Sequence, residues 1–175
     1  MKLDLMTKKQ DEYYTPPYAI RPILKYLPRG AKVWCPFDTE DSMFVKMIRN
    51  HGCDVVATHI VDGHDFFETN RECEYIISNP PYSLKGEVFN RLFALGRPFA
   101  MLVGVVGIFE SQARFEMFRD NEFEVLYMNR RVSYFKDYED QKPALNPPFS
   151  SVYIASKMLP SRLVFEEINK KDVSL

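Results

Sequence analysis

The chain alternates between stretches with a helical spacing of apolar residues and short, continuous apolar runs. Apolar residues three or four positions apart indicate one buried face of a helix, and they predict helices over residues 15–27, 40–51, 87–95 and 111–119. The apolar runs between them predict strands over residues 32–35, 54–58, 75–78, 99–106, 124–128, 132–135 and 152–155. The run over 99–106 is almost uninterrupted, which is typical of a strand buried on both faces.

Residues with special backbone chemistry mark the ends of several of these helices. Thr15 is suited to the N-cap of the first helix, with Pro16 at the first helical position, where no N–H is needed. Pro22 inside this helix removes a backbone hydrogen bond and predicts a bend. Gly52 and Gly96 follow the second and third helices, at the position where a left-handed residue often ends a helix.

The order of these elements predicts the fold class. Alternating helices and strands are typical of an α/β fold, with a mostly parallel sheet covered by helices on both faces. The last strands follow one another without helices, which predicts an antiparallel hairpin at one edge of the sheet. Residues 137–148 form the longest stretch of loop composition, and no interdomain linker is visible. We therefore expect residues 1–175 to form a single domain with no separate target-recognition domain.

Composition narrows the class of protein and its location. Apolar residues make up 46% of the chain and charged residues 27%, which is typical of a globular protein rather than a disordered one. No apolar run approaches the roughly 18 residues of a membrane span, and residues 1–12 lack the apolar segment of a secretory signal. These features predict a cytoplasmic location and no membrane partner. Because the net charge is −1, nucleic acid would have to bind through a local basic patch.

The sharpest chemical signal is the tetrapeptide Asn-Pro-Pro-Tyr at 79–82, directly after the predicted strand 75–78. In an open α/β sheet, ligands bind at the carboxyl ends of the strands, and the tetrapeptide lies at such an end. Pro80 and Pro81 fix their φ angles and lack N–H donors, so they form a stiff turn with free carbonyl groups. The residue before a proline is held extended, which fixes the direction of Asn79.

This geometry suits the transfer of a methyl group to a planar amino nitrogen. Such a nitrogen is a poor nucleophile, because its lone pair is delocalised into the ring. Two acceptors, the Asn79 side-chain oxygen and the Pro80 carbonyl, would hold its two N–H bonds and direct the lone pair at a methyl donor. Tyr82 would stack on an extruded base. The alternative is that the tetrapeptide is a plain proline-stiffened turn.

On these residues the chain resembles the amino-group DNA methyltransferases, which use S-adenosylmethionine (SAM) and carry the signature [Asp/Asn/Ser]-Pro-Pro-[Tyr/Phe/Trp]. Within that family it is most similar to the small phage-type adenine-N6 methyltransferases, over residues 13–155. The resemblance implies a Rossmann-like SAM-dependent methyltransferase fold, SAM as cofactor, and nucleic acid as partner, with DNA favoured over RNA. It also implies a phage-encoded protein in the host cytoplasm. The implied catalytic residues are Asn79, Pro80, Pro81 and Tyr82.

The resemblance also implies which residues hold SAM. Residues 13–17 are similar to the segment that caps the methionine moiety in the family. Residues 33–38 are similar to its first strand and SAM-binding turn, and residues 63–67 to the segment whose aspartate contacts the SAM adenine. The implied cofactor-binding residues are Tyr14, Thr15, Pro16, Pro36, Phe37, Asp38, His59, Asp65 and Phe66.

The chain departs from the family pattern at two places. The first turn, residues 37–42, contains no glycine, whereas the family has Phe-x-Gly-x-Gly there. The second predicted strand ends in Thr58 and His59, where an acidic residue usually holds the ribose hydroxyls, so Asp62 or Asp38 would have to serve. An inactive relative that keeps only the fold is therefore an alternative to an enzyme.

Two residues outside the tetrapeptide are predicted to bind the substrate. Lys85 lies just beyond the predicted catalytic loop and is a candidate for a phosphate contact. Phe149 belongs to a second tetrapeptide, Asn-Pro-Pro-Phe at 146–149, which precedes a strand; we interpret it as a loop over the pocket, with a plain turn as the alternative. Arg130, Arg131 and Lys136 flank a late strand and are further phosphate candidates, with scattered surface charge as the alternative.

Several alternatives remain open at this point. Guanine N2 in RNA and the side-chain amide of a protein glutamine are also planar nitrogens, and a non-catalytic binding module is a different class of answer. Self-association into a homo-oligomer is an open option. Only residues 137–148 and the tail after Pro160 are left to read bases, so we expect a short or relaxed adenine context and a preference for single-stranded substrate. The spacing of the histidines and cysteines matches no metal-ligand pattern, so we expect no metal.

Overall fold

The computed structural model describes residues 14–135 and 149–175. Its elements, in chain order, are α2 (Pro17–Leu24), β1 (Lys32–Cys35), α3 (Met43–Asn50), β2 (Asp54–Ala57), η1 (Ile60–Asp62), β3 (Tyr75–Ser78), η2 (Tyr82–Leu84), α4 (Lys85–Leu95), β4 (Phe99–Gly104), α5 (Gln112–Arg119), β5 (Glu124–Met128), β6 (Ser151–Ser156) and β7 (Leu163–Glu166). Every predicted helix is present, each shorter than predicted except α4, and the predicted bounds of β1, β3 and β5 are confirmed.

The strands form one seven-stranded sheet in the order β2-β1-β3-β4-β6-β5-β7. β2, β1, β3 and β4 run parallel to one another. β6 runs antiparallel to both β4 and β5, and β7 is parallel to β5. The predicted α/β class with a mostly parallel sheet is therefore confirmed, and β5 and β6 supply the antiparallel pair. The chain leaves β1 first toward β2 and then toward β3 on its other side, so the carboxyl ends of β1 and β3 flank a topological switch point, where open sheets bind ligands.

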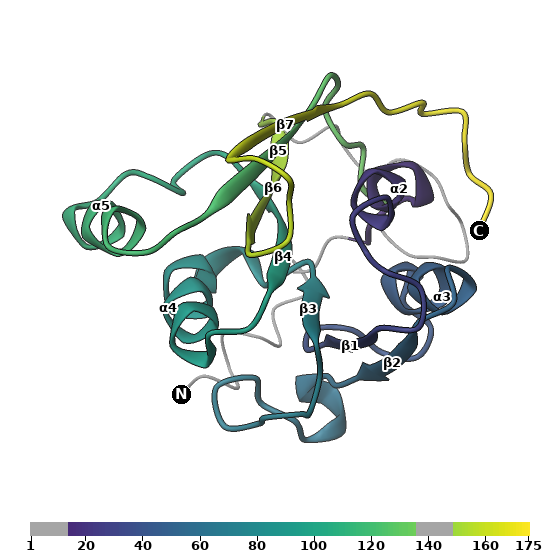
Figure 1. Ribbon diagram of the computed structural model, residues 1–175, viewed down its shortest axis with the longest axis horizontal. Helices are drawn as coiled ribbons and strands as arrows, with labels where there is room; N and C mark the ends of the chain where they lie inside the picture. The colour runs from purple at the N-terminus through teal and green to yellow at the C-terminus, as the bar shows by residue number, and fades with distance from the viewer. Residues whose placement is uncertain (1–13, 136–148) are drawn as a thin grey trace.

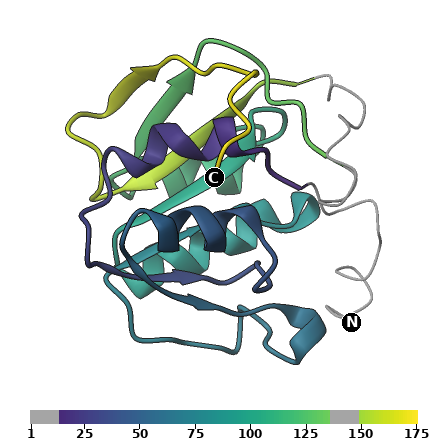
Figure 2. The ribbon, with the colours of Figure 1, turned by 90° about the vertical axis from the view of Figure 1, so that its right-hand side faces the viewer.

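Helices cover both faces of the sheet (Figure 1), with α2 and α3 on the right and α4 and α5 on the left. Figure 2 shows α2 and α3 side by side in front of the sheet. Because successive side chains of a strand point to opposite faces, β4 contributes to two cores. Ala100 and Leu102 pack in the core under α2 and α3, whereas Phe99, Met101 and Val103 pack in the core under α4 and α5. β4 is thus buried on both faces, as predicted, but the strand ends at Gly104, and Val105 and Val106 beyond it are exposed.

The start of α2 differs from the prediction. The helix begins at Pro17, its N-cap is Pro16, and the cap makes no side-chain hydrogen bond. Thr15 therefore precedes the cap, and its buried hydroxyl is available to a different part of the molecule. Pro22 lies inside α2, as expected.

Two further predictions of secondary structure are wrong. Residues 132–135 form no strand; Phe135 makes only an isolated bridge with Tyr14, in which the Phe135 N–H donates to the Tyr14 carbonyl over 2.9 Å. The tail after Pro160, which we expected to be spare, contains β7. The sequence signal for β7 is weak because Leu163 and Phe165 remain exposed and only Val164 between them is buried.

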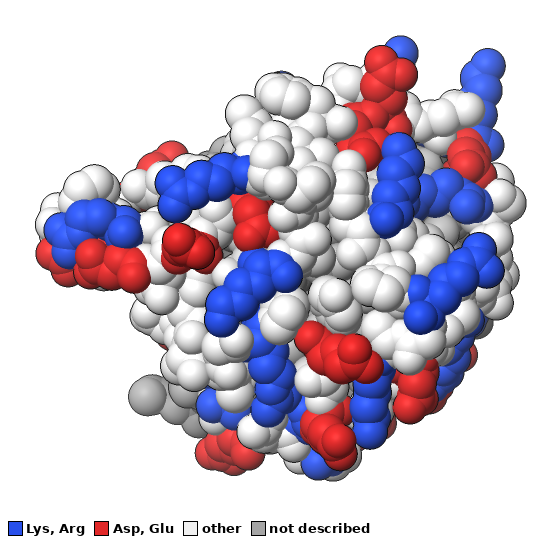
Figure 3. All heavy atoms as spheres, in the orientation of Figure 1, with Lys and Arg blue, Asp and Glu red and all other residues white. Residues whose placement is uncertain are grey.

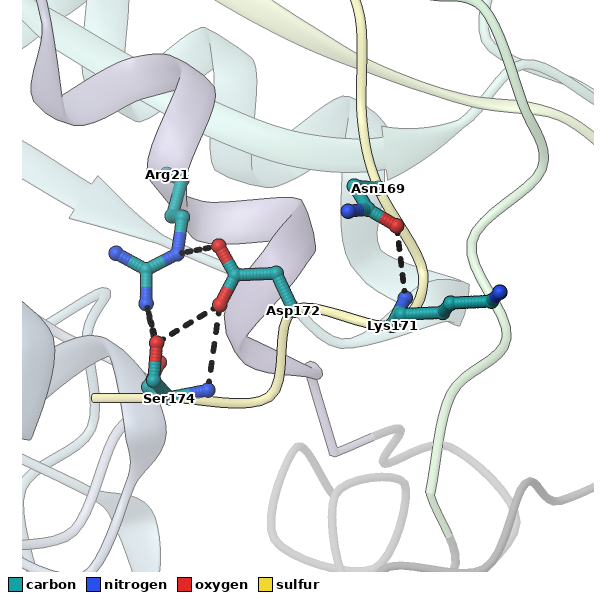
Figure 4. Close-up of polar contacts among 5 residues, drawn as sticks. All are labelled: Arg21, Asn169, Lys171, Asp172 and Ser174. Atoms are coloured by element: carbon teal, nitrogen blue, oxygen red, sulfur yellow. Dashed lines mark hydrogen bonds and ion pairs between the residues drawn. The ribbon is translucent and has the colours of Figure 1, made fainter.

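The tail is also attached to α2. Arg21 pairs with Asp172 over 2.6 Å and donates to the Ser174 hydroxyl over 2.7 Å, as Figure 4 shows. Lys25 donates to Glu166 at the end of β7 over 2.6 Å. These contacts lie at the surface, where single ion pairs contribute little free energy, yet together they set the course of the last ten residues. Within residues 14–135 and 149–175, no helix is long and apolar enough to cross a membrane.

Candidate active site

The first tetrapeptide lies at the centre of the carboxyl edge of the sheet. Asn79 follows β3 directly, Pro80 and Pro81 are buried behind it, and Tyr82 opens η2, which leads into α4. Since β3 lies between β1 and β4, the tetrapeptide is flanked by the ends of both neighbouring strands. The strand–turn–helix setting that the prediction requires is present.

The orientation of the Asn79 side chain is set by Thr15. The Asn79 amide nitrogen donates to the Thr15 hydroxyl oxygen over 3.3 Å. An amide has its donor and its acceptor at opposite corners, so this contact turns the Asn79 carbonyl oxygen away from Thr15. Thr15 itself is only 1% exposed. The segment predicted to cap the cofactor thus also positions the predicted catalytic side chain, a link that sequence spacing of 64 residues does not show.

A small pocket joins the two tetrapeptides. It is lined by Asn79, Pro80, Tyr82, Lys85, Val103, Gly104, Tyr134 and Phe149. The rings of Tyr82 and Phe149 lie with their centroids 5.0 Å apart and their planes tilted by 41°. The pocket measures about 10 Å³, which is room for about one water molecule. Phe149 therefore lines the pocket beside Asn79, and the rest of the second tetrapeptide, residues 146–148, lies outside the described residues.

The end of β4 is shaped to admit both aromatic rings. A Cβ atom on Gly104 would lie 2.7 Å from the Phe149 ring and 2.7 Å from the Tyr82 hydroxyl oxygen. Such distances are far inside van der Waals contact, so a side chain at this position would displace one ring or the other. Gly104 was not among the predicted site residues, although a glycine at the end of the most apolar strand was a usable signal.

Lys85 does not have the exposed position that a phosphate contact needs. Its side chain is buried, and its ammonium group donates to the backbone carbonyls of Gly104 and Val106 over 3.2 and 3.1 Å. The same ammonium lies 4.0 Å from the centroid of the Tyr82 ring. Two carbonyl dipoles and an aromatic face stabilise the buried charge. We therefore reassign Lys85 from the substrate contact to the support beneath Tyr82 and the end of β4.

The rim of the pocket is built from two distant segments. The bridge between Tyr14 and Phe135 ties the chain before α2 to the segment after β5. Next to it, the Ser133 N–H donates to the Tyr18 hydroxyl over 2.8 Å, and Tyr134 shares a 2.8 Å hydrogen bond with the Ser151 hydroxyl. Burial raises the pKa of Tyr18, so this phenol stays protonated and can both donate and accept a hydrogen bond.

The turn after β1 is organised by the carboxylate of Asp38 rather than by glycine. Ser42 donates to one carboxylate oxygen, Ser78 donates to the other over 2.5 Å, and the Asp38 N–H donates to the Thr58 carbonyl over 3.2 Å. The carboxylate is buried, so it faces the protein. We correct the prediction accordingly: the Asp38 side chain ties the turn after β1 to the end of β3 and to the start of α3 instead of contacting a cofactor, and its backbone N–H adds the link to the end of β2. Burial, followed by the charge of Asp38, raises the pKa of the nearby Cys35 thiol.

Phe66 is likewise a core residue. Its side chain is 1% exposed. The ring packs against Phe37 and Trp34, with centroids 4.9 and 5.6 Å away, and under the Arg91 guanidinium at 5.4 Å. This leaves no ring surface for a ligand, so the predicted cofactor contact of Phe66 is corrected too. Phe37 is only half-buried and remains at the edge, while Pro36 before it is buried.

The remaining predicted cofactor residues lie at the end of β2. His59 accepts the Val61 N–H at Nδ1 over 3.1 Å and so caps η1. Asp65 is half-buried, and one of its carboxylate oxygens accepts the Phe67 N–H over 2.9 Å. Asp62, on η1, is exposed. Two carboxylates that follow the carboxyl end of β2 offer acceptors of the kind that the hydroxyl and amino groups of an adenosine moiety need.

Comparison with known proteins supports the fold. The chain matches no protein-family model and no curated protein sequence. Its structure is similar to that of a modification subunit of a putative type I restriction enzyme from Vibrio vulnificus YJ016, with a TM-score of 0.58 and 10% identity over 92% of this chain and 48% of that one. The chain therefore spans about half the length of that subunit. A protein-(glutamine-N5) methyltransferase (release factor-specific) from Alicyclobacillus acidocaldarius subsp. acidocaldarius DSM 446 aligns with a TM-score of 0.40 and 23% identity over 78% of this chain and 86% of that one.

Proposed function

We propose that the protein is a SAM-dependent methyltransferase that acts on the N6 amino group of adenine in nucleic acid, with DNA as its main substrate. The observation that carries this proposal is the placement of Asn79, directly after β3 and oriented by Thr15, at the mouth of a pocket walled by two aromatic rings. The similarity to a restriction-enzyme modification subunit supports the same class of activity.

The chemistry assigned to the tetrapeptide uses two oxygens. The side-chain oxygen of Asn79 and the carbonyl of Pro80 accept the two N–H bonds of the target amino group, which draws its nitrogen toward a tetrahedral shape. Preorganised acceptors of this kind are worth about 10²–10³ in rate each. No general base has to act first, because the nitrogen loses its proton during or after the transfer.

The cofactor edge is assigned to the ends of β1 and β2. A bound SAM supplies a methyl group on a positively charged sulfur. Asp62 and Asp65 would accept hydrogen bonds from its adenosine half, and the half-buried ring of Phe37 would lie beside it. Tyr14 and Thr15 precede α2, where Thr15 contacts Asn79, and they are assigned to the methionine half of the cofactor; His59 shapes the turn that carries Asp62.

Entry of a base requires Phe149 to move relative to Tyr82. A base stacked between two rings needs about 7 Å between them, twice the contact distance of carbon atoms. The two rings are 5.0 Å apart. A base that is already unstacked enters at lower cost, so single-stranded or mismatched substrate is favoured. With the tail engaged in β7, fewer residues remain to read neighbouring bases, which supports a short or relaxed adenine context.

The test is product analysis with the full chain. Labelled SAM would be incubated with adenine-containing single-stranded DNA, duplex DNA, RNA and a glutamine-containing peptide, and the products hydrolysed and analysed by mass spectrometry. We expect N6-methyladenine, formed fastest in single-stranded DNA. Label found in guanine N2 or in a glutamine amide would identify that group, instead of adenine N6, as the substrate. Absence of both transfer and calorimetric SAM binding at millimolar concentration would support a binding module instead.

A further inference from the structure

A second, larger hollow opens at the same edge of the sheet as the candidate active site. It is lined by residues that follow β5, Asn129 and Arg130, and by residues that follow β7, 167–171. Both strands run in the same direction as β3 and β4, since β6 between them is the antiparallel one. The hollow, about 560 Å³ in volume, therefore shares the carboxyl edge with Asn79. We call it the tail groove.

The tail groove concentrates positive charge. Arg130, Lys170 and Lys171 line it, Arg131 adjoins it, and all four side chains are exposed; Glu167 is the one carboxylate in its lining. None of the four cations forms an ion pair with another residue of 14–135 or 149–175. Figure 3 shows one face of the molecule where basic and acidic side chains are interleaved, in keeping with the net charge of −1. An excess of cations within one groove is a local feature against that background.

The backbone around the tail groove is held in place. Asn129 accepts the Ile168 N–H over 2.9 Å, and Asn169 accepts the Lys171 N–H over 3.1 Å. In Figure 4 the Lys171 side chain extends away from the cluster of Arg21, Asp172 and Ser174 that anchors the tail. Because the backbone is already held, binding an anion here requires only the side chains to be ordered, which keeps the entropic cost of binding down.

A short segment connects the tail groove to the candidate active site. Arg130 lines the groove, and Tyr134 lines the pocket of Tyr82 and Phe149. Four residues span at most about 14 Å when extended, and one strand of duplex DNA carries a phosphate about every 3.4 Å along its axis. A strand whose base occupies the pocket therefore brings a neighbouring phosphate to the groove, within about four nucleotides of the target. Lys170 also donates to the Ser133 hydroxyl, next to Tyr134, over 3.0 Å.

We infer that the tail groove binds the phosphate backbone of the nucleic-acid substrate close to the target base. This inference rests on the proposed function, since it takes the target base to lie in the pocket beside Asn79. Arginine and lysine in an open groove suit phosphate oxygens, and interactions of this kind hold the strand in register without reading its sequence.

The experiment compares two charge-matched double variants. Arg130→Gln/Lys171→Gln removes two cations of the groove. Arg29→Gln/Arg162→Gln removes two exposed cations that precede β1 and β7, and so lie at the opposite edge of the sheet. Binding of a fluorescent single-stranded oligonucleotide would be measured by anisotropy from 50 to 300 mM salt, with SAM binding followed by calorimetry as a readout of the intact fold.

The two variants should differ clearly. Removing one cation that neutralises a phosphate of single-stranded nucleic acid lowers the slope of log K against log salt by about 0.7 and weakens binding roughly fivefold at 0.1 M salt. We expect the groove variant to show twice this change in slope and the control variant to show none, with SAM binding unchanged in both. Equal binding and equal slopes for the groove variant and the wild type, an equal weakening in the control, or no nucleic-acid binding by the wild type at 50 mM salt would overturn the inference. Nucleic-acid binding that depends on the tail groove, without any methyl transfer, would support the inference about the groove and contradict the proposed function.

Discussion

The two halves of the carboxyl edge of the sheet differ in where their predicted site side chains point. At the ends of β3 and β4, Asn79, Tyr82 and Phe149 face a common pocket, and buried groups such as Lys85 support them from below. At the ends of β1 and β2, by contrast, Asp38 and Phe66 turn inward. The two prolines fix the direction of the tetrapeptide locally, whereas the glycine-free turn after β1 takes its shape from the buried carboxylate of Asp38.

The largest effect is expected at Asn79. Asn79→Ala removes one preorganised acceptor and should lower the methyl-transfer rate by about 10²–10³-fold, with unchanged SAM affinity and urea unfolding. Asn90→Ala, an exposed asparagine on α4, is the matched control and should leave the rate unchanged. Single-turnover kinetics would measure both. If Asn79→Ala kept more than a tenth of the wild-type rate, the acceptor role would be wrong.

Asp38→Ala tests the other half of the edge. The change leaves the Ser42 and Ser78 hydroxyls without their acceptor and removes two charge-assisted hydrogen bonds. The free energy of unfolding should therefore fall by about 3 kcal/mol. Asp41→Ala, an exposed carboxylate on the same turn, should change it by less than about 0.5 kcal/mol. Urea unfolding compares the two. A variant that stays fully stable but no longer binds SAM would show that Asp38 faces the ligand after all.

Gly104→Ala addresses the contact between the two rings. The added methyl group collides with Phe149 and Tyr82, and overpacking of this kind should cost about 1–3 kcal/mol of stability. Phe149→Ala in the same chain removes one of the two collisions and leaves space into which the Tyr82 ring can shift, so the double variant should be more stable than the sum of the two single changes predicts. Gly86→Ala on α4, where the added atom meets only the flexible end of Arg114, is the control. Strictly additive effects in the double variant would contradict the proposed packing.

Asp65 provides a test of the cofactor assignment. Asp65→Ala should weaken SAM binding by about 1–3 kcal/mol, because a donor of the cofactor is left without its partner. Asp65→Asn keeps an oxygen for the Phe67 N–H and separates the effect of the turn from the effect of the charge. Calorimetry measures both affinities. Unchanged SAM affinity in Asp65→Ala would move the adenosine site away from the end of β2.

The smallest effect is expected where the tail meets α2. A hydrogen bond to Glu166 raises the pKa of Tyr26 to about 12. A folded-state pKa above the unfolded value means that this hydrogen bond stabilises the fold fully below pH 10 and that its contribution disappears as the pH rises toward 12. Tyr26→Phe should cost less than about 1 kcal/mol at pH 8, and its difference from the wild type should vanish as the pH increases. A difference that stayed constant in unfolding experiments from pH 8 to 11.5 would assign the effect to packing.

Much of the architecture followed from local patterns. The apolar runs that became β1 and β3 were predictable to the residue because a buried parallel strand needs little besides continuous apolar side chains. The bounds of β5 were predicted correctly as well, although this strand pairs antiparallel with β6 and leaves Tyr127 exposed. β7 was not predicted, because an edge strand with one buried residue has almost no pattern of apolar positions. The segment 132–135 showed the reverse error, since apolar residues that pack under a rim look like those of a strand.

The sequence by itself determined the helices, most strands of the sheet and the position of the first tetrapeptide, because spacing and proline chemistry act over a few residues. Only the tertiary structure decided which polar side chains face a ligand. Thr15 reaches Asn79 across 64 positions, and Asp38 turns toward Ser78 across 40. Lys85 lies beneath Tyr82 because the first turn of α4 directs it inward. The direction of a side chain depends on the whole packing around it, which no local pattern contains.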